Sequence, residues 1–218
     1  MPRTHSHRIS RIAALALPLF ATATIAVPAA QAHPRMPDPI AHMALTTDPV
    51  AHMALSPQCA NANTPAVSAT KDAMRNAVVC LINEQRSERK LPILHEQPQL
   101  ERSAQSWTNT MVRQNSFTHG TDFSNRISAA GYDWQTAGEN IASGFATPQA
   151  VVDAWMASPG HCRNILDPQY ASVGTGVSSS PVKSAASHPA TWTQDFGLTM
   201  SQSAPSHNWA PADSCPDN

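Results

Sequence analysis

The sequence predicts an α+β fold in which helices pack on a small antiparallel sheet. Apolar residues recur at helical spacing from about residue 70 to residue 157. After Asp167-Pro168 the period changes to two, as in a strand. The turn-rich stretch 178–189 separates two such alternating segments, which predicts a hairpin. Helices first and a hairpin later indicate one sheet covered by helices.

Two long helices come first. The first runs from about Thr70 to Arg89 and stops before Leu91-Pro92, because the residue before a proline disfavours helical backbone. Its apolar stripe is Met74, Ala77, Val78, Leu81 and Ile82. The second helix opens at Pro98, which suits a first helical turn. Its stripe is Leu100, Ala104, Trp107 and Met111.

Two shorter helices and three strands follow. Asp122 or Ser124 caps a third helix that ends at Gly131. Thr147-Pro148 starts a fourth helix, which Pro159-Gly160 ends. This helix is expected to bury Val151, Val152 and Trp155. The expected strands cover 171–177 and 191–197, with a third near 138–143.

Residues 1–32 have the pattern of a secretory signal peptide. Basic residues precede an apolar run from Ile12 to Val27, and Ala30-Gln31-Ala32 is typical of a cleavage site. The run is short and contains Pro18, so it is not expected to span a bilayer. The mature chain is therefore expected to be secreted, extracellular and without a membrane span.

Residues 33–69 are expected to be a Pro-rich and mostly disordered linker, followed by one domain at 70–200 and a tail at 201–218. The linker repeats Asp-Pro-(Ile/Val)-Ala-His-Met-Ala-Leu with a period of ten. Two copies are too few for a stacked repeat fold. The repeated His and Met could bind copper or zinc weakly, but a duplicated spacer is the favoured interpretation.

The charge balance excludes one class of partner. The chain has 14 basic and 15 acidic residues, without a basic stripe along any expected helix. Binding to nucleic acid depends on such a stripe. We therefore expect no nucleic-acid partner.

Four cysteines predict two disulfides in an exported chain. Three pairings are possible. We favour Cys59–Cys80 and Cys162–Cys215, because each joins an arm to the nearer part of the domain, so that Cys215 ties down the tail. Free buried thiols are the alternative. Because His161 and Cys162 are neighbours, their side chains should point to different sides of a turn, which disfavours a catalytic thiol at Cys162.

Three side chains stand beside glycines, where the backbone can turn and present them in a cleft: His119, Glu139 and His161. Two imidazoles and a carboxylate could hold Zn²⁺. They could also exchange protons near neutral pH. The alternative is that each histidine is an ordinary solvated or hydrogen-bonded loop residue.

An ordered set of motifs resembles the bacterial branch of the CAP superfamily, which comprises cysteine-rich secretory proteins, antigen five and pathogenesis-related proteins and is also called the SCP domain. The motifs, within about residues 71–199, are Leu81-Ile82-Asn83-Glu84-Gln85-Arg86, Phe117-Thr118-His119-Gly120, Gly138-Glu139-Asn140-Ile141-Ala142, Trp155 with Ser158 to Leu166, Val173-Gly174-Thr175-Gly176 and Trp192 to Gly197. The resemblance implies an α-β-α sandwich around a three-stranded antiparallel sheet, in a secreted protein.

The resemblance also implies a cleft with two histidines and two acidic residues, in which the histidines of some members bind zinc. His119, Glu139 and His161 match three of these positions, with His119 and His161 as the metal ligands. The second acidic position falls on Ser158, whose hydroxyl cannot replace a carboxylate as a base. Glu139 is a candidate base, or it holds His119 or His161 in place. We expect Asn140, Arg163 and Asn164 to be structural.

Two functions follow from this resemblance. The first is a non-enzymatic binding module whose cleft recognises a small molecule, a lipid, or a cell-wall or peptide ligand. The second is a metal-assisted hydrolase in which the histidines hold zinc and Glu139 activates water. We favour binding, because only one carboxylate is present and no specificity pocket is evident. A structural or antimicrobial role is a third option, and the sequence does not select the ligand.

Overall fold

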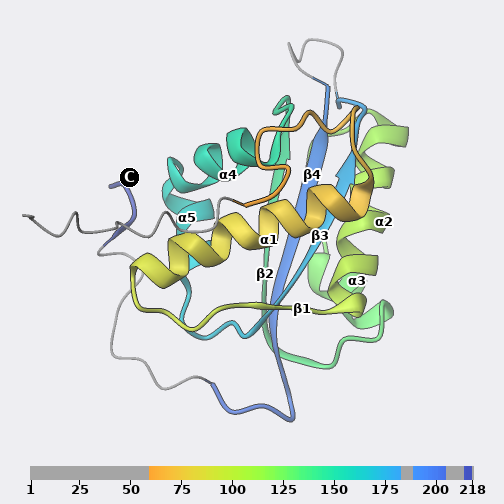
Figure 1. The fold of residues 1–218 in the computed structure, drawn as a ribbon. Coiled ribbons are helices and arrows are strands. Elements are labelled where there is room, and N and C mark those ends of the chain that lie inside the picture. Colours follow the sequence, from red (N-terminus) through yellow and green to blue (C-terminus); the bar gives the residue numbers. More distant parts are fainter. Residues whose placement is uncertain (1–58, 183–188, 205–213, 218) are drawn as a thin grey trace, which may run out of the picture. The chain divides into compact units, whose positions relative to one another are not determined.

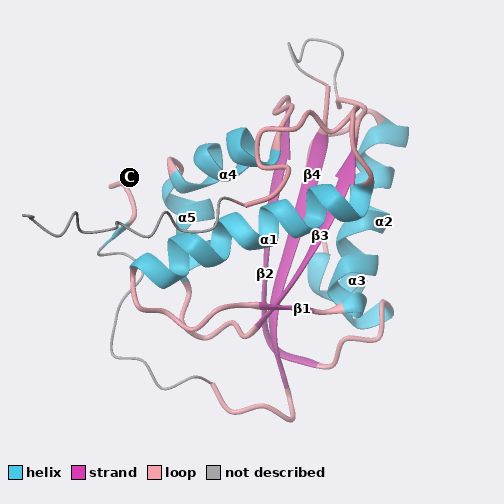
Figure 2. Cartoon of the chain, in the orientation of Figure 1, coloured by secondary structure: helices cyan, strands magenta, loops and turns pink. Residues whose placement is uncertain are grey.

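The computed structural model describes residues 59–182, 189–204 and 214–217. The predicted signal peptide and the ten-residue repeat lie outside these residues. The elements, drawn in Figure 2, are α1 (Lys71–Glu88), β1 (His95–Glu96), α2 (Pro98–Gln114), α3 (Phe123–Ala129), β2 (Trp134–Ser143), α4 (Pro148–Met156), α5 (Pro159–Leu166), β3 (Ser172–Ser178) and β4 (Thr191–Thr199). The predicted α+β class is confirmed.

Helix starts follow the predicted caps. The side chains of Thr70, Asp122 and Thr147 each accept a hydrogen bond from the backbone N–H three residues later. Pro98 and Pro148 occupy the first turns of α2 and α4, where a missing N–H costs nothing. Local signals therefore fix where four of the helices begin.

The sheet has four strands in the order β1-β3-β4-β2, one more than the three predicted. The extra strand, β1, pairs in parallel with β3 over two residues, which is too short for any alternation in the sequence to show. The other pairings, β2 with β4 and β3 with β4, are antiparallel. Strand β2 is an edge strand of this sheet, and the candidate site lies along it.

Helices cover both faces of the sheet (Figure 1). Helix α2 packs directly on β3, because Gly174 and Gly176 have no side chain there. A Cβ atom on Gly174 would lie 2.1 Å from the backbone nitrogen of Glu101, and one on Gly176 would lie 2.4 Å from the backbone of Ala104. The predicted α-β-α layering is confirmed, with α2 and α3 on this face and α1, α4 and α5 on the other.

The main core lies between the sheet and α1, α4 and α5. The sheet contributes Val173, Val177, Trp192 and Phe196, and the helices contribute Met74, Val78, Ile82, Val151, Val152 and Trp155. The predicted inward residues of α4 are confirmed. Cys59, Ala62 and Ala66 also belong to this core, although the sequence assigned them to the linker. None of the helices in the described ranges has the length and apolar character needed to cross a membrane.

Both predicted disulfides are confirmed, Cys59–Cys80 and Cys162–Cys215. Both bonds tie segments outside the helices to the domain: Cys59 lies before α1, and Cys215 lies in the tail. Since Cys162 is bonded, it has no free thiol, and the thiol-catalysis alternative is wrong.

Residues 159–166 form helix α5, where the sequence predicted only a turn. Pro159 and Gly160 end the previous segment, but Pro159 also occupies the first turn of a new helix. His161 and Cys162 therefore diverge because they are successive residues of a helix, rather than of a turn. Cys162 is buried, whereas His161 lines a hollow at the surface.

Arg86 anchors the C-terminal end of α5. It is fully buried, and its guanidinium donates hydrogen bonds of 2.8 Å to the backbone carbonyls of Ile165 and Asp167. Burial lowers the pKa of Arg86 to about 10, although the charge of Asp167 acts in the opposite direction. These hydrogen bonds from a buried cation fix the position of α5, and with it His161, relative to α1.

Candidate functional site

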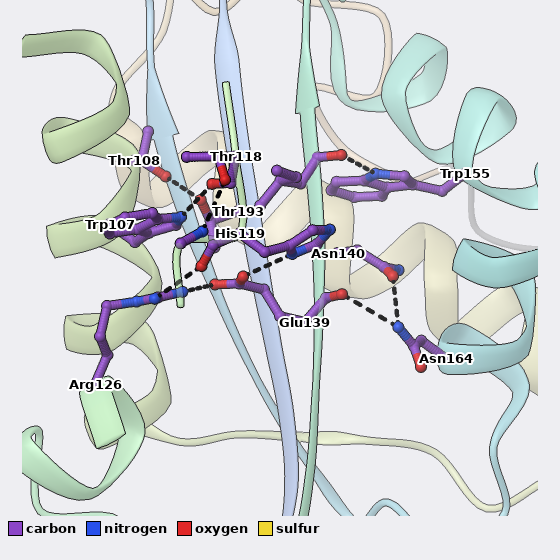
Figure 3. A network of polar contacts seen from close by, with 12 residues as sticks. Trp107, Thr108, Thr118, His119, Arg126, Glu139, Asn140, Trp155, Asn164 and Thr193 are labelled. Atoms are coloured by element: carbon purple, nitrogen blue, oxygen red, sulfur yellow. Dashed lines mark hydrogen bonds and ion pairs between the residues drawn. The ribbon is translucent and has the colours of Figure 1, made fainter. Parts of the chain in front are cut away.

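Glu139 is the centre of the site. It lies on β2, and its side chain is only 1% exposed. Its Oε1 accepts a hydrogen bond from His119 Nδ1 at 2.8 Å, and its Oε2 accepts from Arg126 at 2.5 Å (Figure 3). A buried carboxylate needs such partners, because an unpaired charge away from water is costly.

His119 is held from two sides, in the loop between α2 and α3. Because a carboxylate can only accept, the Nδ1 atom of His119 carries the proton in its bond to Glu139. The following residue, Gly120, has a φ of +69°, and a Cβ there would lie 3.0 Å from the ring of Trp107. The glycine therefore permits both the left-handed backbone and the close approach to Trp107. The imidazole is 49% exposed, which leaves its other face available to a ligand.

Arg126 connects α3 to this loop. Its guanidinium lies 3.8 Å from the centre of the Trp107 ring, and it donates to the backbone carbonyl of His119 at 3.0 Å. The indole N–H of Trp107 in turn donates to the carbonyl of Thr118. Trp107, predicted to lie in the core stripe of α2, is half-buried: it packs against the small cluster that contains Met111, and it also supports the His119 loop. Figure 3 shows this chain of contacts from α2 and α3 to Glu139.

Asn140 and Asn164 join β2 to α5. Asn164 donates to the backbone carbonyl of Glu139 at 3.2 Å and to the side-chain oxygen of Asn140 at 2.9 Å. The Asn140 amide donates to the backbone carbonyl of His161 at 3.2 Å. Both asparagines therefore make the bracing contacts expected of structural residues. Arg163 lies on α5, between His161 and Asn164 in the sequence.

His161 projects from α5 beside an apolar hollow of about 260 Å³. Burial lowers the pKa of His161 below its ordinary value, and the nearby His119 lowers it further. This imidazole is therefore biased toward its neutral form, which can both donate and accept a hydrogen bond. The hollow is lined by Phe117, Ile141, Ala142, Ser143, Phe145, Ala154, Trp155, Ser158 and His161.

A second hollow of about 390 Å³ lies next along β2. It is lined by His119, Phe123, Ala137, Gly138, Glu139, Asn164 and Tyr170. The two hollows share strand β2, with residues 137–139 in one and 141–143 in the other. The fold thus places His119 and Glu139 in one hollow, and His161 and Ser158 in its neighbour.

A metal would find few ligands in this arrangement. Within the described ranges, the single group of three donors lying within 4.8 Å of one another is Cys59, Cys80 and Glu84, and those cysteines are bonded to each other. His119, Glu139 and His161 do not converge in this way. Both oxygens of Glu139 are already engaged, so only the two imidazoles could hold zinc, and catalytic zinc sites use three protein ligands. The residues fit a catalytic zinc ion poorly.

Three residues of the site gave no sequence signal of a role. Arg126 lies in an ordinary short helix, and nothing in its surroundings indicates a partner thirteen residues away on β2. Phe117 was quoted only as part of a motif, yet its side chain lines the apolar hollow and is 42% exposed. Asp195 alternates within β4 and is fully buried, and only the strand register reveals that it lies opposite Glu139.

Residues 79–196, more than half of the chain, match the cysteine-rich secretory protein (CAP) family. The chain belongs to this family. The CAP match includes every residue that lines the two hollows, and it includes Glu139 and Asp195. The predicted resemblance is therefore confirmed.

Two proteins of Bacillus subtilis (strain 168) are similar in sequence to this chain. The protein YkwD is 37% identical over 142 residues, which are 62% of this chain and 51% of YkwD. The membrane protein YlbC is 34% identical over 71 residues, which are 31% of this chain and 20% of YlbC. The chain thus spans about half the length of YkwD and a smaller part of YlbC.

Two solved CAP structures share the fold. An extracellular protein with an SCP domain from Bacillus anthracis str. Ames is 26% identical, with a TM-score of 0.53, over 59% of this chain and 41% of that one. A cysteine-rich secretory protein from Staphylococcus aureus subsp. aureus Mu50 is 16% identical, with a TM-score of 0.50, over 59% of this chain and 40% of that one. The second likeness concerns the fold alone.

Proposed function

We propose that this CAP protein is an extracellular binding module whose cleft along β2 takes a small ligand with an apolar and a polar part. The apolar part fits the hollow that Phe117, Phe145 and Trp155 line, and the polar part faces His161 and Ser158 at its rim. Apolar hollows with a few convergent polar groups and a perturbed pKa are the usual form of small-molecule sites. An extracellular location is supported by the signal-like N-terminus, the two disulfides and the extracellular relative from B. anthracis.

The state of Glu139 favours binding over hydrolysis, and this observation carries the proposal. A general base must reach the proton that it removes, directly or through one water. The Glu139 side chain is 1% exposed, and its two oxygens are engaged by His119 and Arg126. Its chemistry is that of a carboxylate that orients an imidazole. The alternative role of Glu139 as a base in a zinc hydrolase thus has neither a free carboxylate nor a third metal ligand in its support.

The test uses the fluorescent amphiphile anilinonaphthalene sulfonate, which has an apolar ring system and a charged end. It is titrated into the full chain and into Ala154→Phe, which places a ring into the hollow from α4. The matched control is Ala150→Phe, on the exposed side of the same helix. We expect at least a tenfold loss of affinity in Ala154→Phe alone. Each lost CH₂ contact is worth about 0.8 kcal/mol, so the loss of two exceeds the roughly 1.4 kcal/mol that corresponds to a tenfold change. Equal binding by all three proteins would place the probe elsewhere and overturn the proposal.

Hydrolysis is tested separately with a mixed peptide library, with and without a chelator. The proposal predicts no cleavage that depends on His119 and His161. Cleavage that the chelator stops and that His161→Ala abolishes would establish the hydrolase instead.

A further inference from the structure

Two buried acids, Glu139 and Asp195, lie opposite each other on neighbouring strands of the sheet. Strands β2 and β4 are antiparallel, and Glu139 is the direct register partner of Asp195. Side chains at such positions lie on the same face, with Cβ atoms about 5 Å apart. Both acids are buried, with exposed fractions of the whole residue of 6% for Glu139 and 1% for Asp195. Like charges placed opposite each other in this way are destabilising.

Glu139 and Asp195 differ in their hydrogen-bond and ion-pair partners. Glu139 has Arg126 and His119 as hydrogen-bonded partners. Asp195 has no ion pair within the described residues, and neither of its carboxylate oxygens has a hydrogen-bond partner at ordinary geometry. An isolated buried carboxylate costs several kcal/mol, which is usually avoided by keeping the proton. Only one of these two acids is therefore equipped to hold a negative charge.

The groups that face Asp195 are few. Across β2 it faces Glu139, with His119 beyond it, and from α3 the charge of Arg126 reaches it. Ser103 on α2 offers a hydroxyl, and on β3 the register partner is Gly174, which brings no side chain. Burial raises the pKa of Asp195 well above its ordinary value, and the charge of Glu139 raises it further, whereas Ser103 and Arg126 lower it. The raised pKa of Asp195 agrees with the lack of a hydrogen-bond partner for its carboxylate among the described residues.

We propose that Asp195 is a positioning residue that keeps its proton at neutral pH and directs it toward Glu139, so that the pair carries a single negative charge. Each carboxylate oxygen has two lone pairs, so Glu139 can accept from Asp195 while it still accepts from His119 and Arg126. The single charge is then balanced by Arg126. The Nδ1–H of His119 still donates to Glu139, and the Nε2 atom of His119 remains available to the cleft. The inference concerns how His119 is presented and does not depend on which ligand the cleft binds.

Infrared spectroscopy of the full chain tests this directly, because the C=O stretch of a protonated carboxylic acid is well separated from carboxylate bands. We expect one such band at neutral pH, shifted when aspartate is labelled with ¹³C at its side-chain carboxyl. The band should vanish in Asp195→Asn and persist in Asp133→Asn, whose side chain is exposed. No band, or a band that aspartate labelling leaves unchanged, would overturn the proposal. The labelled wild-type protein gives this answer even if Asp195→Asn does not fold.

A pH profile supplies a second readout that a merely structural role would not move. Above the ordinary pKa of an aspartate, about 4, the unfolded chain has lost the proton that folded Asp195 keeps. The folding equilibrium constant of the wild type should then fall about tenfold per pH unit relative to that of Asp195→Asn, until folded Asp195 also ionises. A constant ratio between the two proteins from pH 4 to pH 8 would contradict a retained proton.

Discussion

Arg126 provides the most informative single substitution at the site. It pairs with a carboxylate that is 1% exposed, and it donates to the loop that carries His119. Removing one partner of a buried pair costs about 3–5 kcal/mol, because the other charge stays buried. The Arg126 side chain is itself 20% exposed, so water can partly replace it and the lower end of that range applies. The contact with Trp107 adds about 0.5–1 kcal/mol. We therefore expect Arg126→Ala to lower the free energy of unfolding by about 3.5–4 kcal/mol.

The assay is urea unfolding of the full chain with its disulfides intact. The midpoint should fall with little change in the slope, which indicates that stability changed rather than the compactness of either state. Arg102→Ala is the matched control, because Arg102 is an exposed arginine that makes one bond, to the carbonyl of Ala130. Its effect should stay within about 0.5 kcal/mol.

A double-mutant cycle separates the charge from the packing. Glu139→Gln removes the negative charge that Arg126 neutralises, so Arg126→Ala should cost less in that background than in the wild type. The expected coupling is about 2 kcal/mol, within the range measured for contacting residues. Additive effects, or an Arg126→Ala protein as stable as the wild type, would refute the claim that Arg126 stabilises the fold through its buried ion pair with Glu139.

Three further predictions concern other parts of the account. Because the pKa of His161 is lowered in the folded protein, the wild type should lose stability as the pH falls from the unfolded pKa of about 6.5 toward the folded pKa. The stability of His161→Gln, plotted against pH, should lack that loss. Parallel curves for the two proteins would refute the prediction. Gly174→Ala should cost about 1–3 kcal/mol in thermal or urea unfolding because α2 must move, whereas Gly160→Ala, with open space around it, should be nearly neutral; the reverse order would contradict the packing of α2 on β3. Calorimetric titration with ZnCl₂ should show weak binding through two imidazoles, which is lost in the double variant His119→Ala/His161→Ala and retained in His95→Ala; tight binding that survives the double variant would place zinc elsewhere.

Features that depend on neighbouring residues could be predicted from the sequence. The caps at Thr70 and Thr147 and the first-turn prolines Pro98 and Pro148 determine helix starts through contacts within four residues. Helix α5 escaped prediction because Pro159-Gly160 is compatible with both an end and a start, and only the packing against Arg86 and the disulfide at Cys162 favours the start. Strand β1 escaped because two residues contain no period.

The candidate site likewise combines features that neighbouring residues predict with contacts between residues far apart in the chain. Glycines beside His119, Glu139 and His161 marked them as candidates, but their roles depend on residues far away in the chain. Glu139 is engaged by Arg126 from α3, and it faces Asp195 from a strand more than fifty residues later. No local pattern encodes either contact. The sequence therefore predicts the polar residues of the cleft, whereas only the structure shows that the Glu139 carboxylate is already bonded to His119 and Arg126.

The central claim is that the apolar hollow beside His161 is the ligand site. A crystal structure of the full chain soaked with anilinonaphthalene sulfonate tests this most directly. Density for the rings is expected between Phe117 and Trp155, with the charged end toward His161 and the Glu139–His119 contact unchanged. Density only in a different hollow, such as the one that Arg102 and Ser106 line between α2 and α3, would contradict it.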